Sequence, residues 1–173
     1  MIKGILSWGK PRIFVKALID GGVLRELPTP VDDSTNLETT EGDKTEAKIE
    51  GGEIEAVRYD KSTYKLSMQI RMKAGSKMPF PNKDGLVNDN YEVTVAPENA
   101  EAYGFVMKEA HVSVKTSYTT NDGILVDVAF DALSNQAGDP QCEFGMVELT
   151  ESEGKVTAIK FTPIEVESDI VSA

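Results

Sequence analysis

The sequence contains few of the residues on which enzyme and metal chemistry usually depend. It has one cysteine, Cys142, and one histidine, His111. A single cysteine cannot form an intramolecular disulfide, and a cysteine-rich zinc site is excluded as well. A histidine catalyst needs a nucleophile or an orienting acid, and no motif in the sequence supplies either. We therefore expect a surface histidine, a structural cysteine, no catalytic residue and no metal or cofactor.

Aromatic residues are scarce and long apolar runs are missing. Phe, Trp and Tyr make up 7% of the chain, which argues against the exposed aromatic platform of a carbohydrate-binding module. No apolar run approaches the roughly 20 residues that a membrane helix requires. Gly4 and Gly9 interrupt the first eleven residues and Pro11 ends them, so the apolar core of a signal peptide is not present. We expect neither export nor membrane insertion.

Positive charge is also in deficit. The chain has 18 Lys and Arg against 29 Asp and Glu, which gives a net charge of −11 and a pI of about 4.6. This balance favours solubility and argues against a groove that binds nucleic acid. It is compatible with a surface past which nucleic acid slides without binding. The length of 173 residues predicts a single domain at residues 1–162, followed by an acidic C-terminal tail at residues 163–173.

The clearest positive signal is a period of two in residues 64–72, which predicts a strand with one buried and one solvent face. The buried face comprises Tyr64, Leu66, Met68, Ile70 and Met72, and the solvent face comprises Lys65, Ser67, Gln69 and Arg71. Residues 53–59 predict a shorter strand before it. Asp60 and Ser62 favour a turn between the two. We expect these strands to form a central antiparallel hairpin.

Similar patterns recur along the rest of the chain. Asn121-Asp122-Gly123 is the strongest hairpin signal. One short helix is expected at residues 97–103, because Pro97 suits a first turn and Glu98 complements the helix dipole. The remaining strands are expected at residues 11–19, 23–27, 91–96, 105–118, 124–133, 142–150 and 155–162. Regularly spaced strands with turn signals predict an antiparallel β-sandwich or barrel with one short α-helix.

A long loop is expected at residues 74–90, and loops longer than about 12–15 residues are usually functional or disordered. It carries apolar side chains that cover either its own domain or a neighbouring subunit. Trp8 lies outside any periodic strand. It either docks on the core of its own subunit or contacts another subunit, where tryptophan is enriched. The candidate inter-subunit contacts are Trp8, Met78, Phe80, Leu86 and Val87.

Two acidic groups lack the spacing of a catalytic or calcium site. Asp127 and Asp131 lie on one face of one predicted strand, about 13 Å apart at ~3.3 Å per residue, which is too far for a glycosidase pair. Residues 32–36 cluster oxygen ligands but lack the spacing and terminal glutamate of a calcium loop. We expect ordinary surface carboxylates and a turn at these places.

The order of features over roughly residues 10–162 resembles the phage major tail tube protein family. The resemblance rests on Asp33-Ser-Thr, Glu50-Gly-Gly-Glu53, the alternating strand at 64–72, Ala96-Pro97-Glu98-Asn99, Val112-Ser-Val-Lys-Thr-Ser and Asp122-Gly123-Ile124. The family implies a β-sandwich or barrel flanked by one helix, similar to the type VI secretion tube protein. It also implies no active site.

The resemblance further implies hexameric rings that stack into a hollow tube, through which DNA passes without specific binding. The partners would be copies of the chain and other tail proteins, with no membrane. The protein would be made in the bacterial cytoplasm and end in the virion. The face carrying Lys65 and Arg71 is a candidate lining of the tube. The loop at residues 74–90 and both termini would make ring-to-ring contacts.

Two other readings stay open. One is a different virion tail or injection-machine component. The other, from a different class, is a β-sandwich module that binds carbohydrate or a cell surface. An enzyme is the least expected of all.

Overall fold

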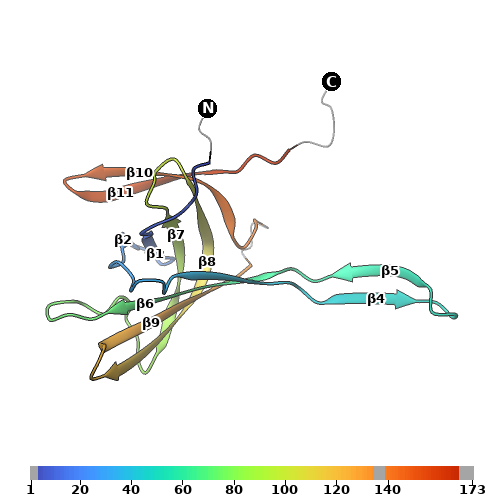
Figure 1. Cartoon of the computed structure of the whole chain (residues 1–173), viewed down its shortest axis with the longest axis horizontal. Helices are drawn as coiled ribbons and strands as arrows, with labels where there is room; N and C mark the ends of the chain where they lie inside the picture. Colours follow the sequence, from blue (N-terminus) through green and yellow to red (C-terminus); the bar gives the residue numbers. More distant parts are fainter. Residues whose placement is uncertain (1–3, 135–138, 168–173) are drawn as a thin grey trace.

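The protein is an antiparallel β structure, seen here in a computed structural model that describes residues 4–134 and 139–167. Within those residues it contains strands and no helix, and hence no helix that could span a membrane (Figure 1). The strands are β1 (Arg12–Ala17), β2 (Leu24–Glu26), β3 (Asn36–Thr40), β4 (Lys44–Lys48), β5 (Ile54–Tyr59), β6 (Thr63–Arg71), β7 (Leu86–Ala96), β8 (Tyr103–Thr119), β9 (Gly123–Ala132), β10 (Glu143–Ser152) and β11 (Lys155–Pro163).

The strand β8 connects the parts of the main sheet. The sheet has the order β2-β1-β7-β8-β9-β6-β3, and the β10–β11 hairpin joins it through β8. The start of β8, from Tyr103 to Val106, pairs with β10. The later part, from Ala110 to Thr119, pairs with β9. Two layers therefore diverge from β8, as expected for a sandwich (Figure 1).

The first strand is buried on both sides because it separates two apolar clusters. Ile13 and Val15 face the large cluster formed with β6, β7, β8 and β9. Phe14 faces the small cluster against the β10–β11 hairpin, where Val147 and Phe161 pack. Burying a side chain of this size stabilises the fold by about 1.5–3 kcal/mol. These contacts hold the two layers together.

Strand β6 confirms the alternation expected over residues 64–72. Leu66, Met68 and Ile70 are buried, while Lys65 and Arg71 are exposed. The hairpin expected at residues 121–123 is also confirmed, since β8 and β9 pair in register from this turn. Where one face of a strand meets the core, period-two alternation was a reliable guide.

The central hairpin was predicted wrongly. Strand β6 pairs with β3 and β9, and β5 pairs with β4 instead. The reversal occurs at Gly51 and Gly52, whose φ angles are 96° and 84°, values that glycine adopts without steric cost. Residues 60–62 carry the chain straight on from β5 into β6. The two glycines therefore decide the turn, and the Asp and Ser signals at 60–62 do not.

The predicted helix at residues 97–103 is a turn. The Asn99 side-chain Oδ1 accepts a hydrogen bond from the Glu101 N–H at 2.9 Å, and the Asn99 carbonyl accepts one from Ala102 at 3.0 Å. Only residues 97–102 separate β7 from β8, which is too few for a stable helix. An Asx turn satisfies the backbone over this distance.

The ends of two other predicted segments also differ. The loop expected at residues 74–90 is shorter, because β7 begins at Leu86. Strand β11 extends through Pro163, and the Ile164 N–H donates to the Phe144 carbonyl at 3.0 Å. The predicted acidic tail therefore begins as part of the sheet, and its residues 168–173 lie outside the described residues.

Candidate functional site

The residues with possible chemistry do not converge. His111 is exposed on β8, and Cys142 is buried at 5% exposure. Burial, with a smaller contribution from Glu143, raises the pKa of the Cys142 thiol to about 12, so the thiol stays protonated and unreactive. In the described part of the chain, no three His, Cys, Asp or Glu side chains are grouped to hold a metal ion.

The broadest polar surface is the solvent face of β3, β6, β9 and β8, which we call the charged sheet face. Cross-strand register sets its side chains in rows. The first row runs Glu38, Lys65, Asp131, His111. The second runs Asn36, Ser67, Ala129, Ser113, and the third contains Gln69, Asp127 and Lys115. Side chains directly opposite one another lie about 4.5–5.5 Å apart at Cβ.

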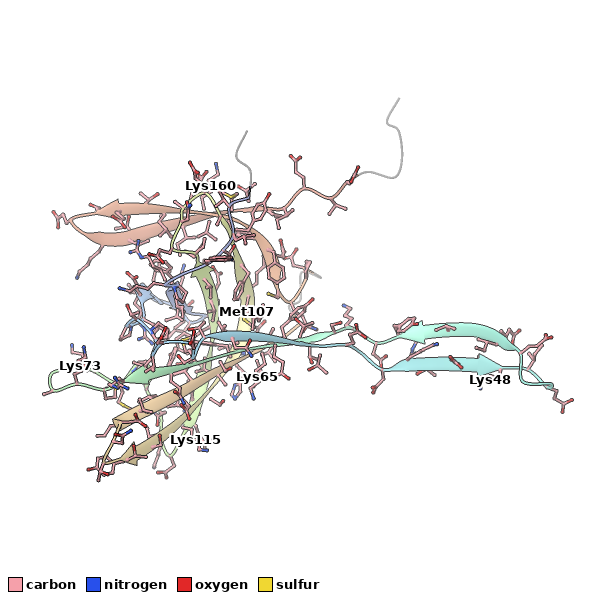
Figure 2. All side chains as sticks on the ribbon, viewed as in Figure 1. Lys48, Lys65, Lys73, Met107, Lys115 and Lys160 are labelled. Atoms are coloured by element: carbon pink, nitrogen blue, oxygen red, sulfur yellow. The ribbon has the colours of Figure 1, made fainter. Side chains whose placement is uncertain are left out.

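Charged side chains on this face lie opposite side chains of the other sign on the neighbouring strand. Lys65 lies between Glu38 and Asp131, and Lys115 lies opposite Asp127. Figure 2 labels Lys65 and Lys115 over these strands. The middle row of small side chains forms a shallow groove between the two charged rows. Because charges of opposite sign are neighbours across the strands, they partly cancel and weaken the electrostatic field of the face.

A second surface is the hairpin arm, residues 41–62, which continues β3 and β6 away from the sheet (Figure 1). Its strands β4 and β5 form a separate two-stranded sheet. At the base of the arm, the Asp60 N–H donates to the Asp43 carbonyl at 2.9 Å. A Cβ on Gly42 would lie 1.9 Å from the Asp60 carbonyl oxygen, so this close approach requires glycine.

One face of the arm carries an exposed apolar row that belongs to neither apolar cluster of the described residues. A register shift between Ala47 and Lys48 aligns three side chains of β5, namely Ile54, Val57 and Tyr59, which are 52%, 45% and 67% exposed. Beside this row, Glu46 of β4 bridges Lys44 at 2.7 Å and Lys48 at 3.9 Å. An isolated two-stranded hairpin is at best marginally stable in water. Packing of another chain against the apolar row would therefore stabilise the arm.

The third surface surrounds the N-terminal segment. The Lys10 N–H donates to the Glu98 carboxylate at 2.8 Å, and the Ser7 hydroxyl donates to the Tyr103 carbonyl. These bonds hold the segment across the turn at residues 97–102. An open pocket forms there, lined in part by Leu6 and Trp8. Trp8 is 74% exposed, so it does not dock on its own core.

The candidate inter-subunit contacts predicted from the loop divide into two pairs. Met78 and Leu86 are 45% and 73% exposed, whereas Phe80 and Val87 are 1% and 4% exposed. Phe80 packs edge-on against Tyr91, with ring centroids 4.9 Å apart. Phe80 and Val87 therefore belong to the subunit core and are not free to contact another copy. Met78, Leu86 and Trp8 remain available.

Sequence reasoning missed the arm as a separate element and missed its apolar row. Ile54 and Val57 are three residues apart, so they do not follow a period of two. The signal present in the sequence was the Gly51-Gly52 pair midway between two polar, extended segments of similar length. A glycine pair in that position is a hairpin turn signal. On β6, Lys65 and Arg71 are exposed, and Ser67 and Gln69 are half-buried on the same face, opposite the core.

No family model and no curated protein matches this sequence.

Proposed function

We propose that this chain is a structural subunit that associates with copies of itself, as the subunit of a phage or prophage tail tube does. The observation that carries the proposal is the hairpin arm. Its row Ile54, Val57 and Tyr59 stands in solvent, and in the described part of the chain its strands pair only with each other. Exposed apolar side chains and open strand edges favour association with another chain.

The charged sheet face supports the same proposal. It ends at the edge strand β3, whose one partner among the described strands is β6. Edge-to-edge addition of copies would complete the hydrogen bonding of such an edge and extend the sheet into a ring. The matched rows around Lys65 and Lys115 would then line the ring. A lining with compensated charge lets DNA pass without specific binding.

The proposal also includes the composition of the assembly and its location. The rings are hexameric, they stack into a hollow tube, and the tube is part of a virion; the protein is made in the bacterial cytoplasm. Its partners are further copies and other tail proteins, and it carries out no catalysis.

Size-exclusion chromatography and negative-stain electron microscopy of the purified protein test the proposal. Rings or tubes are the expected result. A protein that stays monomeric as its concentration is raised, and that elutes at the size of a single chain, contradicts it.

One observation favours a second candidate, a module that binds carbohydrate. Trp8 is 74% and Tyr103 is 51% exposed, and the Ser7–Tyr103 hydrogen bond brings their segments together. A glycan array separates the candidates: retention of a glycan that is lost in Trp8→Ala supports the module.

A further inference from the structure

The two ends of the molecule carry opposite unpaired charge. At one end is the arm tip, residues 49–57, with Glu50, Glu53 and Glu55 and no lysine or arginine. All three glutamates are exposed. In the described part of the chain none of them forms a salt bridge, although Glu46, further down the arm, forms two.

At the other end is a basic segment, residues 70–83, which we call the lysine loop. It contains Arg71, Lys73, Lys77 and Lys83 and no aspartate or glutamate. Its cations are exposed, and none makes a salt bridge with a described residue. The segment therefore carries positive charge only, whereas the whole chain has a net charge of −11.

The geometry keeps the two groups apart within one molecule. Strands β5 and β6 run in sequence from the arm to the lysine loop, along the longest axis of the molecule (Figure 1). Figure 2 labels Lys48 on the arm and Lys73 at the opposite end. The charges of one copy therefore cannot pair with each other. They can pair between copies only if the copies are arranged head to tail.

Apolar surface accompanies the charge at both ends. The arm tip itself contains Ile54 and Val57, and the lysine loop carries Met78, which is 45% exposed. An apolar centre surrounded by polar contacts is the usual composition of a protein interface. The arm tip and the lysine loop are complementary in charge, and both expose apolar side chains.

We propose that the arm tip of one copy docks on the lysine loop of the next copy. The inference rests on the proposed self-association and names the two surfaces that would make the contact. The interface is heterologous, since different patches meet, and heterologous contacts repeat into rings or open filaments instead of stopping at a dimer. The partner that binds the arm tip is thus a second copy of this chain.

A charge swap tests the contact. Glu50→Lys/Glu53→Lys and Lys73→Glu/Lys77→Glu each place like charges across the interface. Each double variant should raise the protein concentration needed for assembly by roughly tenfold or more, as measured by sedimentation. The quadruple variant carrying all four substitutions should assemble at nearly the wild-type concentration, because the charges are opposite again.

The matched control keeps net charge constant. Lys73→Glu/Lys77→Glu combined with Glu148→Lys/Glu153→Lys has the same net charge of −11 as the wild type and the swap, but its new lysines lie on the β10–β11 hairpin. It should remain defective. Restoration by the control, or failure of the swap to restore, overturns the docking contact. Wild-type protein that does not assemble at all overturns the proposed function as well, so the two failures are distinguishable.

Cross-linking gives a second readout. In a Cys142→Ala background, a Glu53→Cys/Lys77→Cys variant treated with a short bis-maleimide should yield a ladder of dimers, trimers and higher species. A mixture of the two single-cysteine variants should stop at dimers, since each copy then has one reactive end. Monomer alone in the double variant, with wild-type tubes still forming, contradicts the contact.

Discussion

The ring of Phe80 lies edge-on to the ring of Phe130, with centroids 5.6 Å apart and an interplanar angle of 77°. Phe80 belongs to the segment between β6 and β7, and Phe130 lies near the end of β9. Arg25 of the β2 strand lies over the same Phe80 ring at 4.9 Å. The connection after β6 is thus anchored in the core by Phe80 beside the buried Pro79, while Lys77 and Met78 are exposed.

Phe80→Ala should therefore destabilise the subunit. Removing a fully buried phenylalanine costs about 3–5 kcal/mol, a large share of the roughly 5–15 kcal/mol by which proteins are stable. Urea denaturation measures the change. Met78→Ala is the control from the same segment, and at 45% exposure it should change the free energy of unfolding by about 0.5 kcal/mol or less. Similar losses for both variants would contradict the assignment of Phe80 to the core.

The arm should be dispensable for folding. Thr40 and Thr63 are direct cross-strand partners, so a two-residue Asn-Gly turn can join them in place of residues 41–62. We expect circular dichroism and the melting temperature to stay close to wild type, while self-association is lost. A variant that fails to fold would show that the arm contributes to the core, and one that still assembles would show that another surface drives association.

Cys142 should be inert in the folded protein. Its pKa of about 12 leaves roughly a thousandfold less thiolate at pH 8 than an ordinary thiol with a pKa near 9. Iodoacetamide labelling at pH 8 should be correspondingly slow without urea and fast with it. Fast labelling of the native protein would show that the residue is accessible.

The same shift has a consequence for stability at high pH. The unfolded chain releases the thiol proton near pH 9, whereas the folded chain retains it up to about pH 12. Between these values the unfolded state binds fewer protons, so the free energy of unfolding falls as the pH rises. Cys142→Ala should lose this part of the alkaline decline, which denaturant titrations at pH 8 and pH 10.5 can measure.

Arg12 joins the first strand to the last hairpin. Its guanidinium donates to Glu26 at 2.9 and 3.0 Å and to Glu151 at 3.1 Å, and these carboxylates raise the pKa of Arg12. Because the group is partly exposed, Arg12→Gln should cost only about 1 kcal/mol or less at low salt. The loss should shrink in 0.5 M salt. Arg58→Gln on the arm, 3.6 Å from Asp60, is the control and should change little.

Much of the strand architecture could be predicted because the information was local. Leu66, Met68 and Ile70 meet the core at every second position, and a single strand displays that pattern by itself. The 121–123 turn is equally local, since its residue types fix the backbone conformation. These parts of the fold depend on short-range chemistry.

The arm could not be predicted in the same way, since both faces of β4 and β5 are in solvent and neither alternates. A register shift near Ala47 further breaks the spacing of Ile54 and Val57. Phe80 and Met78 pose a related problem. Both are apolar loop residues. Phe80 enters the core and Met78 stays outside because of the course of the chain in the tertiary structure, which the local sequence does not specify. The assembly surfaces are therefore the part of the molecule that sequence patterns describe least well.

Electron microscopy of the wild-type protein and the Asn-Gly arm replacement, concentrated side by side, tests the central claim most directly. The account predicts hollow tubes of uniform diameter from the wild type, and only monomers from the folded variant. Wild-type protein that remains monomeric at every concentration, or identical tubes from both proteins, would contradict it.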